Sequence, residues 1–154
     1  CRIIPTIGFS IEFFNFAPHR DMYLIDVDAK MRFGPLWSKM TNDVSVRAIV
    51  FVVDSISMND DTGYRGAVET RAALNVCLKK TQESSDDVAL LVLANKQEKS
   101  EALNLEDIAW KLGLHEMNGR HADITTHWCI QGCSALCGDG LCEGFEWLCD
   151  VLVS

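Results

Sequence analysis

An amide, an ammonium and a carboxylate follow one another at the end of an apolar run, in the stretch LLVLANKQE that ends at Glu98. Asn95, Lys96 and Glu98 together offer donors, acceptors and an aliphatic stem, and such a set can read a flat ligand with donor and acceptor edges. A strand that leaves the core into a solvated loop would explain the same residues without a ligand. The elements that position these groups decide between the two interpretations.

Strand-like segments alternate with helical patterns along the chain. Continuous apolar runs at Arg47–Ser55 and Asp87–Asn95 are typical of strands covered on both faces, and Thr126–Ala135 is expected to form a further strand and its turn. The cap and stop signals of Asn104–Leu114 predict a helix. Further helices are expected from apolar periodicity at two places, Gly66–Lys80 and Asp139–Val153.

Strands separated by helices of this length predict an α/β fold with a mostly parallel sheet and right-handed crossovers. A short link joins Gly8–Phe16 to Met22–Val27, which predicts an antiparallel hairpin. We therefore expect a single domain of residues 1–154 with Gly8–Phe16 as its one antiparallel edge strand. The strands expected to run parallel are Met22–Val27, Arg47–Asp54, Asp87–Asn95 and Trp128–Gly132.

Ligands of parallel sheets bind outside the carboxyl ends of the strands. Polar groups stand at four such ends: Asp26, Asp54, the NKQE sequence that ends at Glu98, and the CSAL sequence that begins at Cys133. Because each apolar strand ends in a short polar signature, the sequence favours a ligand site over four unrelated solvated loops.

Composition excludes several classes of function. The formal net charge of the 154 residues is -8, whereas a nucleic-acid partner requires clustered Lys and Arg. The sequence has no apolar run long enough for a membrane span. Four of the seven cysteines are closely spaced: Cys129, Cys133, Cys137 and Cys142. Because they form no CxxC pair, small buried thiols explain them better than a zinc site does. An odd number of cysteines predicts free thiols in an intracellular, reducing compartment, either the cytoplasm or an organelle interior.

Six segments occur in the order typical of one known family: IPTIGF (Ile4–Phe9), GPLW (Gly34–Trp37), FVVDS (Phe51–Ser55), LANKQ (Leu93–Gln97), KLGLH (Lys111–His115) and GDGLCEGFEWL (Gly138–Leu148). Together they resemble the ADP-ribosylation factor (Arf) family of small GTP-binding proteins. The resemblance implies a three-layer, P-loop-NTPase-like small GTPase fold that binds GTP or GDP with magnesium.

The resemblance also assigns the base-reading residues. In the family the Asn-Lys-x-Asp signature reads guanine, and here Asn95 would support the loop while the stem of Lys96 covers the base. The acid is Glu98 rather than Asp, and its extra methylene displaces the carboxylate by about 1.5 Å, the length of one C–C bond. Ser134 and Ala135 match the family's Ser/Cys-Ala signature, which would place a backbone N–H on the guanine carbonyl.

The phosphate side departs further from the family. No G-x-x-x-x-G-K-[ST] sequence occurs, so the first strand, the P-loop and the first helix are either upstream of Cys1 or lost. Thr6 and Asp26 match magnesium-binding positions of the two switches. Where the family reads DVGGQD, this chain reads DVDAKM, so Ala29 occupies a nucleotide-binding position and Lys30 replaces the water-orienting Gln.

The partner surface is altered as well. Family members expose an aromatic triad between the switches, of which Phe9 remains while Ile25 and Met40 occupy the other two positions. With Trp37, these residues would still form an apolar patch for protein partners. Membrane association stays open, because an amino-terminal myristoylated helix would lie upstream of Cys1.

Two functions follow from the resemblance. The first is an Arf-like GTP-binding protein with a degenerate second switch and doubtful GTP hydrolysis. The alternative is a pseudo-GTPase that serves as a structural or scaffolding subunit of a larger protein assembly. Departures at Ala29, Lys30 and Glu98 favour the alternative.

Overall fold

The computed structural model describes residues 9–17, 20–27, 46–58, 64–83, 88–118 and 127–153. The chain divides into two compact units, Cys1–Lys39 and Met40–Ser154. The prediction of one domain over residues 1–154 stays a prediction. Several residues of the expected site lie outside the described ranges: Thr6, Asp28, Ala29, Lys30, Trp37 and Met40.

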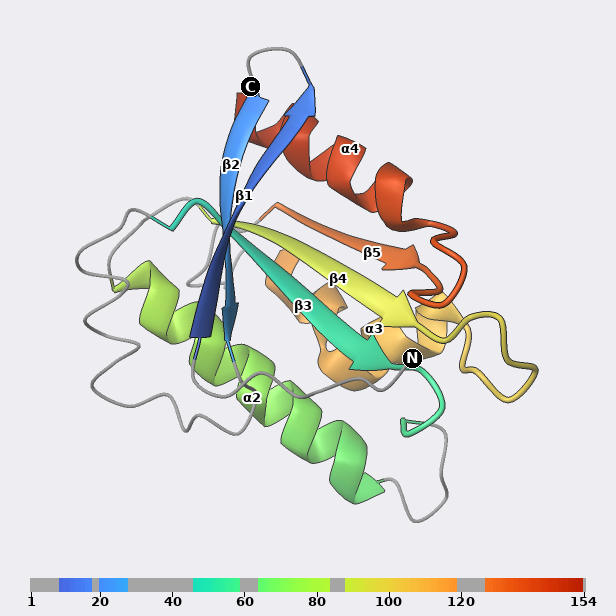
Figure 1. Ribbon diagram of the computed structural model, residues 1–154. Helices are drawn as coiled ribbons and strands as arrows, with labels where there is room; N and C mark the ends of the chain where they lie inside the picture. Colours follow the sequence, from blue (N-terminus) through green and yellow to red (C-terminus); the bar gives the residue numbers. More distant parts are fainter. Residues whose placement is uncertain are drawn as a thin grey trace. The chain divides into compact units, whose positions relative to one another are not determined.

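The first unit contains an antiparallel hairpin of β1 (Phe9–Ala17) and β2 (Arg20–Val27), shown in blue in Figure 1. Cross-strand packing holds the pair together, and the rings of Phe13 and Tyr23 lie 5.4 Å apart between centroids. The hairpin prediction is confirmed, with strand ends that differ from the expected ones by one or two residues.

The second unit contains a parallel sheet in the order β3 (Ala48–Asp54), β4 (Ala89–Asn95) and β5 (Trp128–Gly132). The central strand β4 is buried at every position except Asn95, because both of its edges are paired and both of its faces are covered. This confirms the parallel prediction for these strands. Whether Met22–Val27 runs parallel to them stays a prediction.

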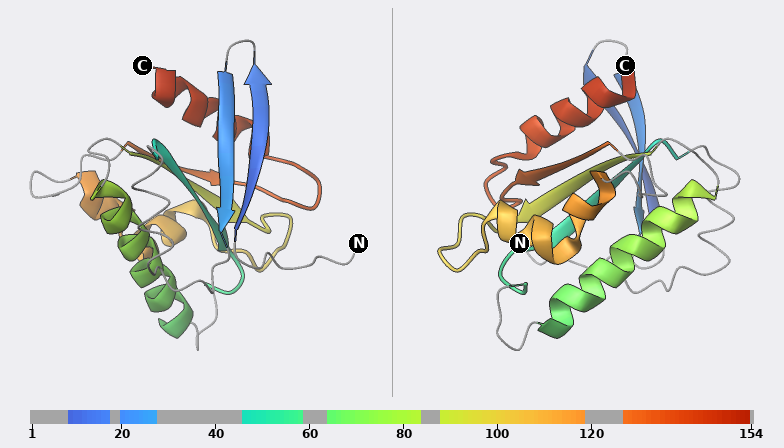
Figure 2. Two further views of the ribbon diagram at one scale, coloured as in Figure 1. Left: turned by 60° about the vertical axis from the view of Figure 1, so that its left-hand side comes forward. Right: turned by 180° about the vertical axis from the view of Figure 1, so that it is seen from behind.

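Helices cover both faces of this sheet (Figures 1 and 2): α4 (Leu141–Val153) lies on one face, and α2 (Tyr64–Gln82) and α3 (Leu105–Leu112) lie on the other. Helix α3 begins where Asn104 accepts a hydrogen bond from the Asp107 N–H, 2.9 Å away. It ends at Gly113, whose φ of 74° suits a residue without a side chain. A short 3₁₀ helix, η1 (Leu114–Asn118), follows and was not expected from the sequence.

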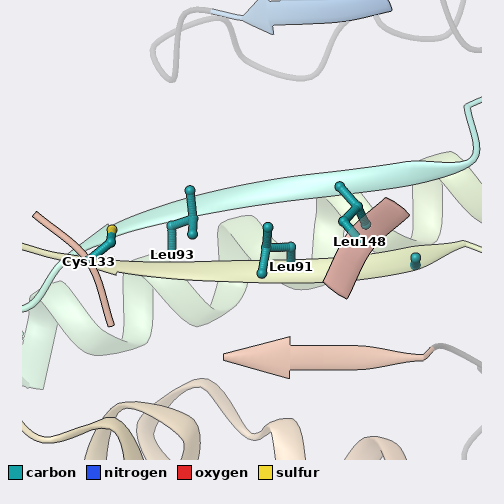
Figure 3. Close-up of a cluster of buried hydrophobic side chains, with 5 residues drawn as sticks. Leu91, Leu93, Cys133 and Leu148 are labelled. Atoms are coloured by element: carbon teal, nitrogen blue, oxygen red, sulfur yellow. The ribbon is translucent and has the colours of Figure 1, made fainter. Parts of the chain in front are cut away.

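A compact apolar cluster joins α4 to the sheet (Figure 3). Leu91 and Leu93 of β4 pack with Leu148 of α4 and with Cys133, the residue after β5. Gly144 permits this close approach, because a Cβ added there would lie 3.1 Å from the Leu93 side chain. Within the described residues, no helix is both long and apolar enough to cross a membrane.

Candidate nucleotide site

Asn95 joins the two loops that follow β4 and β5. Its side-chain oxygen accepts hydrogen bonds from the backbone N–H of Lys96 at 2.8 Å and from that of Ala135 at 2.9 Å. The Cys133 N–H donates to the Ala94 carbonyl at 2.9 Å, which extends the contact between the strands into these loops. One amide side chain thus brings the sequence-predicted residues of both loops together.

Lys96 adopts an unusual backbone conformation and makes a close ion pair. Its φ of 73° lies in the left-handed region, which side-chain-bearing residues rarely occupy. Its Nζ lies 2.6 Å from Oδ2 of Asp54, the last residue of β3. The other carboxylate oxygen of Asp54 accepts hydrogen bonds from the N–H groups of Ile56 and Ser57. The carboxylate is therefore fixed on one side by backbone and on the other by Lys96.

These contacts also act on the charge of Asp54. Partial burial by itself raises the pKa of this carboxyl group, but the hydrogen bond from Lys96 and those from the Ile56 and Ser57 N–H groups outweigh that effect. The net result is a pKa below the usual value, so Asp54 carries a negative charge at neutral pH. The Lys96 ammonium therefore has a negatively charged partner at neutral pH.

Gln97 is the residue that sequence reasoning missed. Its side-chain amide donates to the Ser55 hydroxyl at 2.9 Å and to the Leu103 carbonyl at 3.1 Å. Its backbone N–H donates to the Cys133 carbonyl at 3.1 Å. Gln97 therefore connects the ends of β3, β4 and β5. Its position inside the Asn-Lys-x-acid signature was the available signal, although the signature leaves that residue unspecified.

Glu98 and Ser134 come from different loops and lie next to each other. The Ser134 hydroxyl is the foremost cause that lowers the pKa of the exposed Glu98 carboxyl group. The same hydroxyl is buried and makes no hydrogen bond of acceptable geometry with any described group. The two groups are neighbours, and their alignment falls short of a hydrogen bond. Of this pair, the exposed Glu98 carboxylate is the group that a ligand can reach.

Backbone contacts shape the loop that carries Ser134 and Ala135. The Ser134 N–H donates to the Asp139 carbonyl at 2.9 Å, and the Gly138 N–H donates to the Ser134 carbonyl at 2.8 Å. Gly140 has a φ of 75°, and a Cβ there would collide with the carbonyl oxygen of Gly132. A glycine is thus required for the chain to pass this close to the end of β5.

The structure brings together one subset of the predicted site residues: Asn95, Lys96, Glu98, Ser134 and Ala135. The Ala135 N–H, which we expected on a guanine carbonyl, donates to Asn95 here. Its use by a ligand stays a prediction, since a carbonyl would have to share or replace that bond. Asp26 and Ile25 lie on β2 in the other unit, Asp26 exposed and Ile25 half-buried; Phe9 begins the adjacent strand β1.

The cysteines of the second unit do not gather around a common point. Within the described ranges, no three side chains among His, Cys, Asp and Glu are arranged to hold a metal ion. Six cysteines are described, and all six carry free thiols. Burial raises the pKa of the Cys77 thiol to about 11 and also raises the pKa of Cys129 and Cys133. Buried Cys77 and Cys133 and half-buried Cys129 pack as small apolar groups.

Comparison with known proteins places this geometry in context. The sequence pattern of the ADP-ribosylation factor family matches residues 1–152. In fold, the chain is similar to the small GTPase Arl6 BBS3 of Trypanosoma brucei, solved with the bound nucleotide analogue GppNp. The TM-score is 0.73 and the sequence identity is 23%, over 97% of this chain and 82% of that chain. The prediction of a small GTPase fold is confirmed.

Proposed function

This chain belongs to the ADP-ribosylation factor family of small GTP-binding proteins, and from that premise we propose that it binds GTP and GDP but hydrolyses GTP slowly or not at all. The observation that carries the proposal is the double hydrogen bond of the Asn95 side chain to Lys96 and Ala135. It aligns two loops from different strands at the edge of the sheet where ligands of parallel sheets bind.

Base recognition follows from the groups around the Asn95 side chain. The Glu98 carboxylate is exposed and ionised, so it can accept hydrogen bonds from the ring N–H and exocyclic amine of guanine. The aliphatic stem of Lys96 supplies an apolar surface for one face of the base. An adenine base presents no matching pair of donors to a carboxylate, so the site favours guanine.

Slow hydrolysis follows from the second switch, whose substituted residues Asp28, Ala29 and Lys30 lie outside the described ranges. The family glutamine can accept a hydrogen bond from the attacking water, whereas the Lys30 ammonium can only donate. Asp28 would also bring a negative charge towards the phosphates, and like charges repel strongly in a water-poor cleft. Both substitutions oppose the preorganised charge stabilisation that phosphoryl transfer requires.

Magnesium is the metal that the donor chemistry fits. Asp26 offers a carboxylate at the end of β2 and Thr6 a hydroxyl, and Mg²⁺ takes oxygen ligands of this kind together with waters and substrate phosphates. The ion would neutralise phosphate charge. Thr6 and Asp26 are the residues of this chain that would hold it.

A displacement experiment tests nucleotide binding. Full-length protein is loaded with fluorescent mant-GDP, and unlabelled GDP, GTP or ADP is added in a titration. We expect GDP and GTP to displace the probe at concentrations at least about 100-fold lower than ADP, since a site built to hydrogen-bond a base rejects one that lacks the donors. If mant-GDP fails to bind, or if ADP displaces it as well as GDP does, the proposal is contradicted.

A pseudo-GTPase that acts as a scaffold is the second candidate. The consecutive departures at Asp28, Ala29 and Lys30 favour it. It differs from the first candidate in one measurable respect, because a scaffold without a working site purifies stable and free of guanine nucleotide. Nucleotide extracted from purified full-length protein and identified by chromatography distinguishes the two.

Protein partners are proposed to bind the hairpin of β1 and β2, in which Phe9 and Ile25 lie. The predicted contributions of Trp37 and Met40 concern residues outside the described ranges. The support is an apolar face on the hairpin, where the side chains of Ile11, Phe13 and Tyr23 are 60%, 57% and 73% exposed. Substitution of Tyr23 by Lys should weaken capture of such a partner while it leaves nucleotide displacement unchanged. Loss of both would show that the hairpin acts on the nucleotide site instead.

A further inference from the structure

We propose that Asp54 is a positioning residue of the base site: it binds the Lys96 ammonium and so keeps it away from Glu98, whose carboxylate stays available for the base. The inference rests on the proposed function, because it assigns a role within a guanine-binding site. Asp54 acts only through Lys96 and needs no contact with the ligand.

The parallel pairing of β3 with β4 determines which residues meet. In that register Asp54 stands beside Asn95, so the next residue along the chain, Lys96, begins its turn directly next to the carboxylate. The resulting distance between Nζ and Oδ2 is 2.6 Å, although the two residues are 42 positions apart in sequence. The sheet itself therefore sets the geometry of the pair.

Asp54 is held firmly enough to direct a flexible lysine. Its Oδ1 accepts from the Ile56 N–H at 3.0 Å and from the Ser57 N–H at 3.3 Å, while the Ser57 hydroxyl donates to its carbonyl at 3.0 Å. Lys96 is held at its other end by the backbone bond to Asn95. With the backbone and the ammonium both fixed, the aliphatic stem between them is restricted to few rotamers.

Glu98 is the alternative partner that Lys96 does not take. The Ser134 hydroxyl is the largest cause of the lowered pKa of Glu98, and the charges of Lys99 and Lys96 lie close enough to lower it further. Yet among the described residues the ion pair of Lys96 is with Asp54, and none joins it to Glu98. An ammonium released from Asp54 would be free to bind the Glu98 carboxylate and occupy the acceptors that guanine needs.

The test compares variants that separate the ion pair from the backbone contacts. Asp54→Asn keeps an oxygen that can accept from Ile56 and Ser57 but removes the charge. Glu83→Gln is the matched control, since it removes another exposed ion pair, between Glu83 and Lys80, with an N···O distance of 3.3 Å. Lys96→Met removes the ammonium and keeps an apolar stem.

Dissociation of mant-GDP from full-length protein is the readout, beside the thermal unfolding midpoint. We expect Asp54→Asn to raise the dissociation rate about fivefold to tenfold and Glu83→Gln to change it less than about twofold. In the Lys96→Met background, Asp54→Asn should have no further effect, because no ammonium remains to be released. The unfolding midpoints of Asp54→Asn and Glu83→Gln should change by similar small amounts.

Each outcome distinguishes the inference from its premise. If the unsubstituted protein binds no mant-GDP, the proposed function fails and the role of Asp54 falls with it. If that protein binds normally and Asp54→Asn dissociates at the original rate, only the role of Asp54 is overturned. An equal effect of Asp54→Asn with and without Lys96 would also overturn it, since the residue would then act through the backbone alone.

Discussion

The two halves of the expected nucleotide site differ in how far their residues depart from the family pattern. On the base side, Asn95 and Lys96 match, and a single methylene distinguishes Glu98 from the usual acid. On the phosphate side, the substituted residues are consecutive and change the chemistry: Asp28 and Ala29 replace two glycines and Lys30 replaces the glutamine.

In the proposed function, this difference separates binding from turnover. Base recognition depends on a rigid arrangement of loops, which Asn95 and Gln97 provide through bonds to the backbone and to Ser55. Hydrolysis depends on a switch that must move onto the γ-phosphate, and glycines supply that freedom. A protein that keeps the rigid base-binding loops and loses the mobile switch would hold GTP as a persistent ligand and would not hydrolyse it.

The largest effect should follow from breaking the base side at Asn95. Asn95→Ala removes the acceptor of two backbone N–H groups. Because this change should cost about one to three kcal/mol of binding free energy, the affinity for GDP should fall up to about 100-fold. Asn104→Ala is the matched control, because it removes an amide that accepts one backbone N–H at the start of α3. Displacement titration of both variants measures the effect. Equal losses would mean that helix stability, not loop alignment, controls binding.

Restoring the phosphate side should raise GTP hydrolysis. The combined variant Asp28→Gly, Ala29→Gly and Lys30→Gln recovers the mobile loop and an acceptor for the attacking water, so we expect a rate increase of about tenfold or more. Single-turnover measurement of released phosphate is the assay. The single change Lys30→Met serves as the control, since it removes the ammonium without adding an acceptor. An unchanged rate in the triple variant would show that turnover is limited elsewhere.

A smaller effect should come from shortening the acid on the base side. Glu98→Asp returns the carboxylate to the family position, and a regained charge-assisted hydrogen bond should tighten GDP binding about tenfold. Glu101→Asp, in the same segment but outside the signature, controls for the loss of a methylene. Displacement titrations compare the two. Weaker binding by Glu98→Asp would mean that the loop has adjusted to the longer side chain.

The smallest effect concerns the thiols of the second unit. Exposed Cys137 and Cys142 should react with a maleimide at pH 8 well before buried Cys77, which reacts only on unfolding. The pKa of Cys77 lies at about 11, above the ordinary 9.0, so its contribution to stability is complete below pH 9 and is lost as pH rises through about 11. Mass spectrometry of labelled peptides gives the order of reaction. Early labelling of Cys77 would contradict the described core.

Much of the second unit could be predicted from sequence, because its strands are continuous apolar runs and its helices carry clear end signals. Asn104 and Gly113 delimit α3 in the structure as the sequence indicated. The 3₁₀ helix at Leu114–Asn118 could not be foreseen, since it continues past a left-handed glycine that normally signals the end of a helix.

The sequence named candidate residues of the site but not the contacts between them. The sequence indicates that Asn95 and Ala135 belong to one site, yet the bond between them depends on a loop geometry that only the folded chain defines. The ion pair of Asp54 with Lys96 and the bonds of Gln97 depend on the register of β3 against β4, which no local pattern encodes. Contacts between residues on neighbouring strands therefore cannot be predicted from single sequence motifs.

The nucleotide that remains on the protein after loading with GTP tests the central claim most directly. Full-length protein is loaded with GTP and magnesium, freed of excess nucleotide, held at 25 °C for several hours, and its bound nucleotide is identified by chromatography. We expect bound nucleotide that is still GTP, because the base side retains it and the second switch does not hydrolyse it. Bound GDP would contradict the loss of turnover, and the absence of any guanine nucleotide would contradict the intact base side.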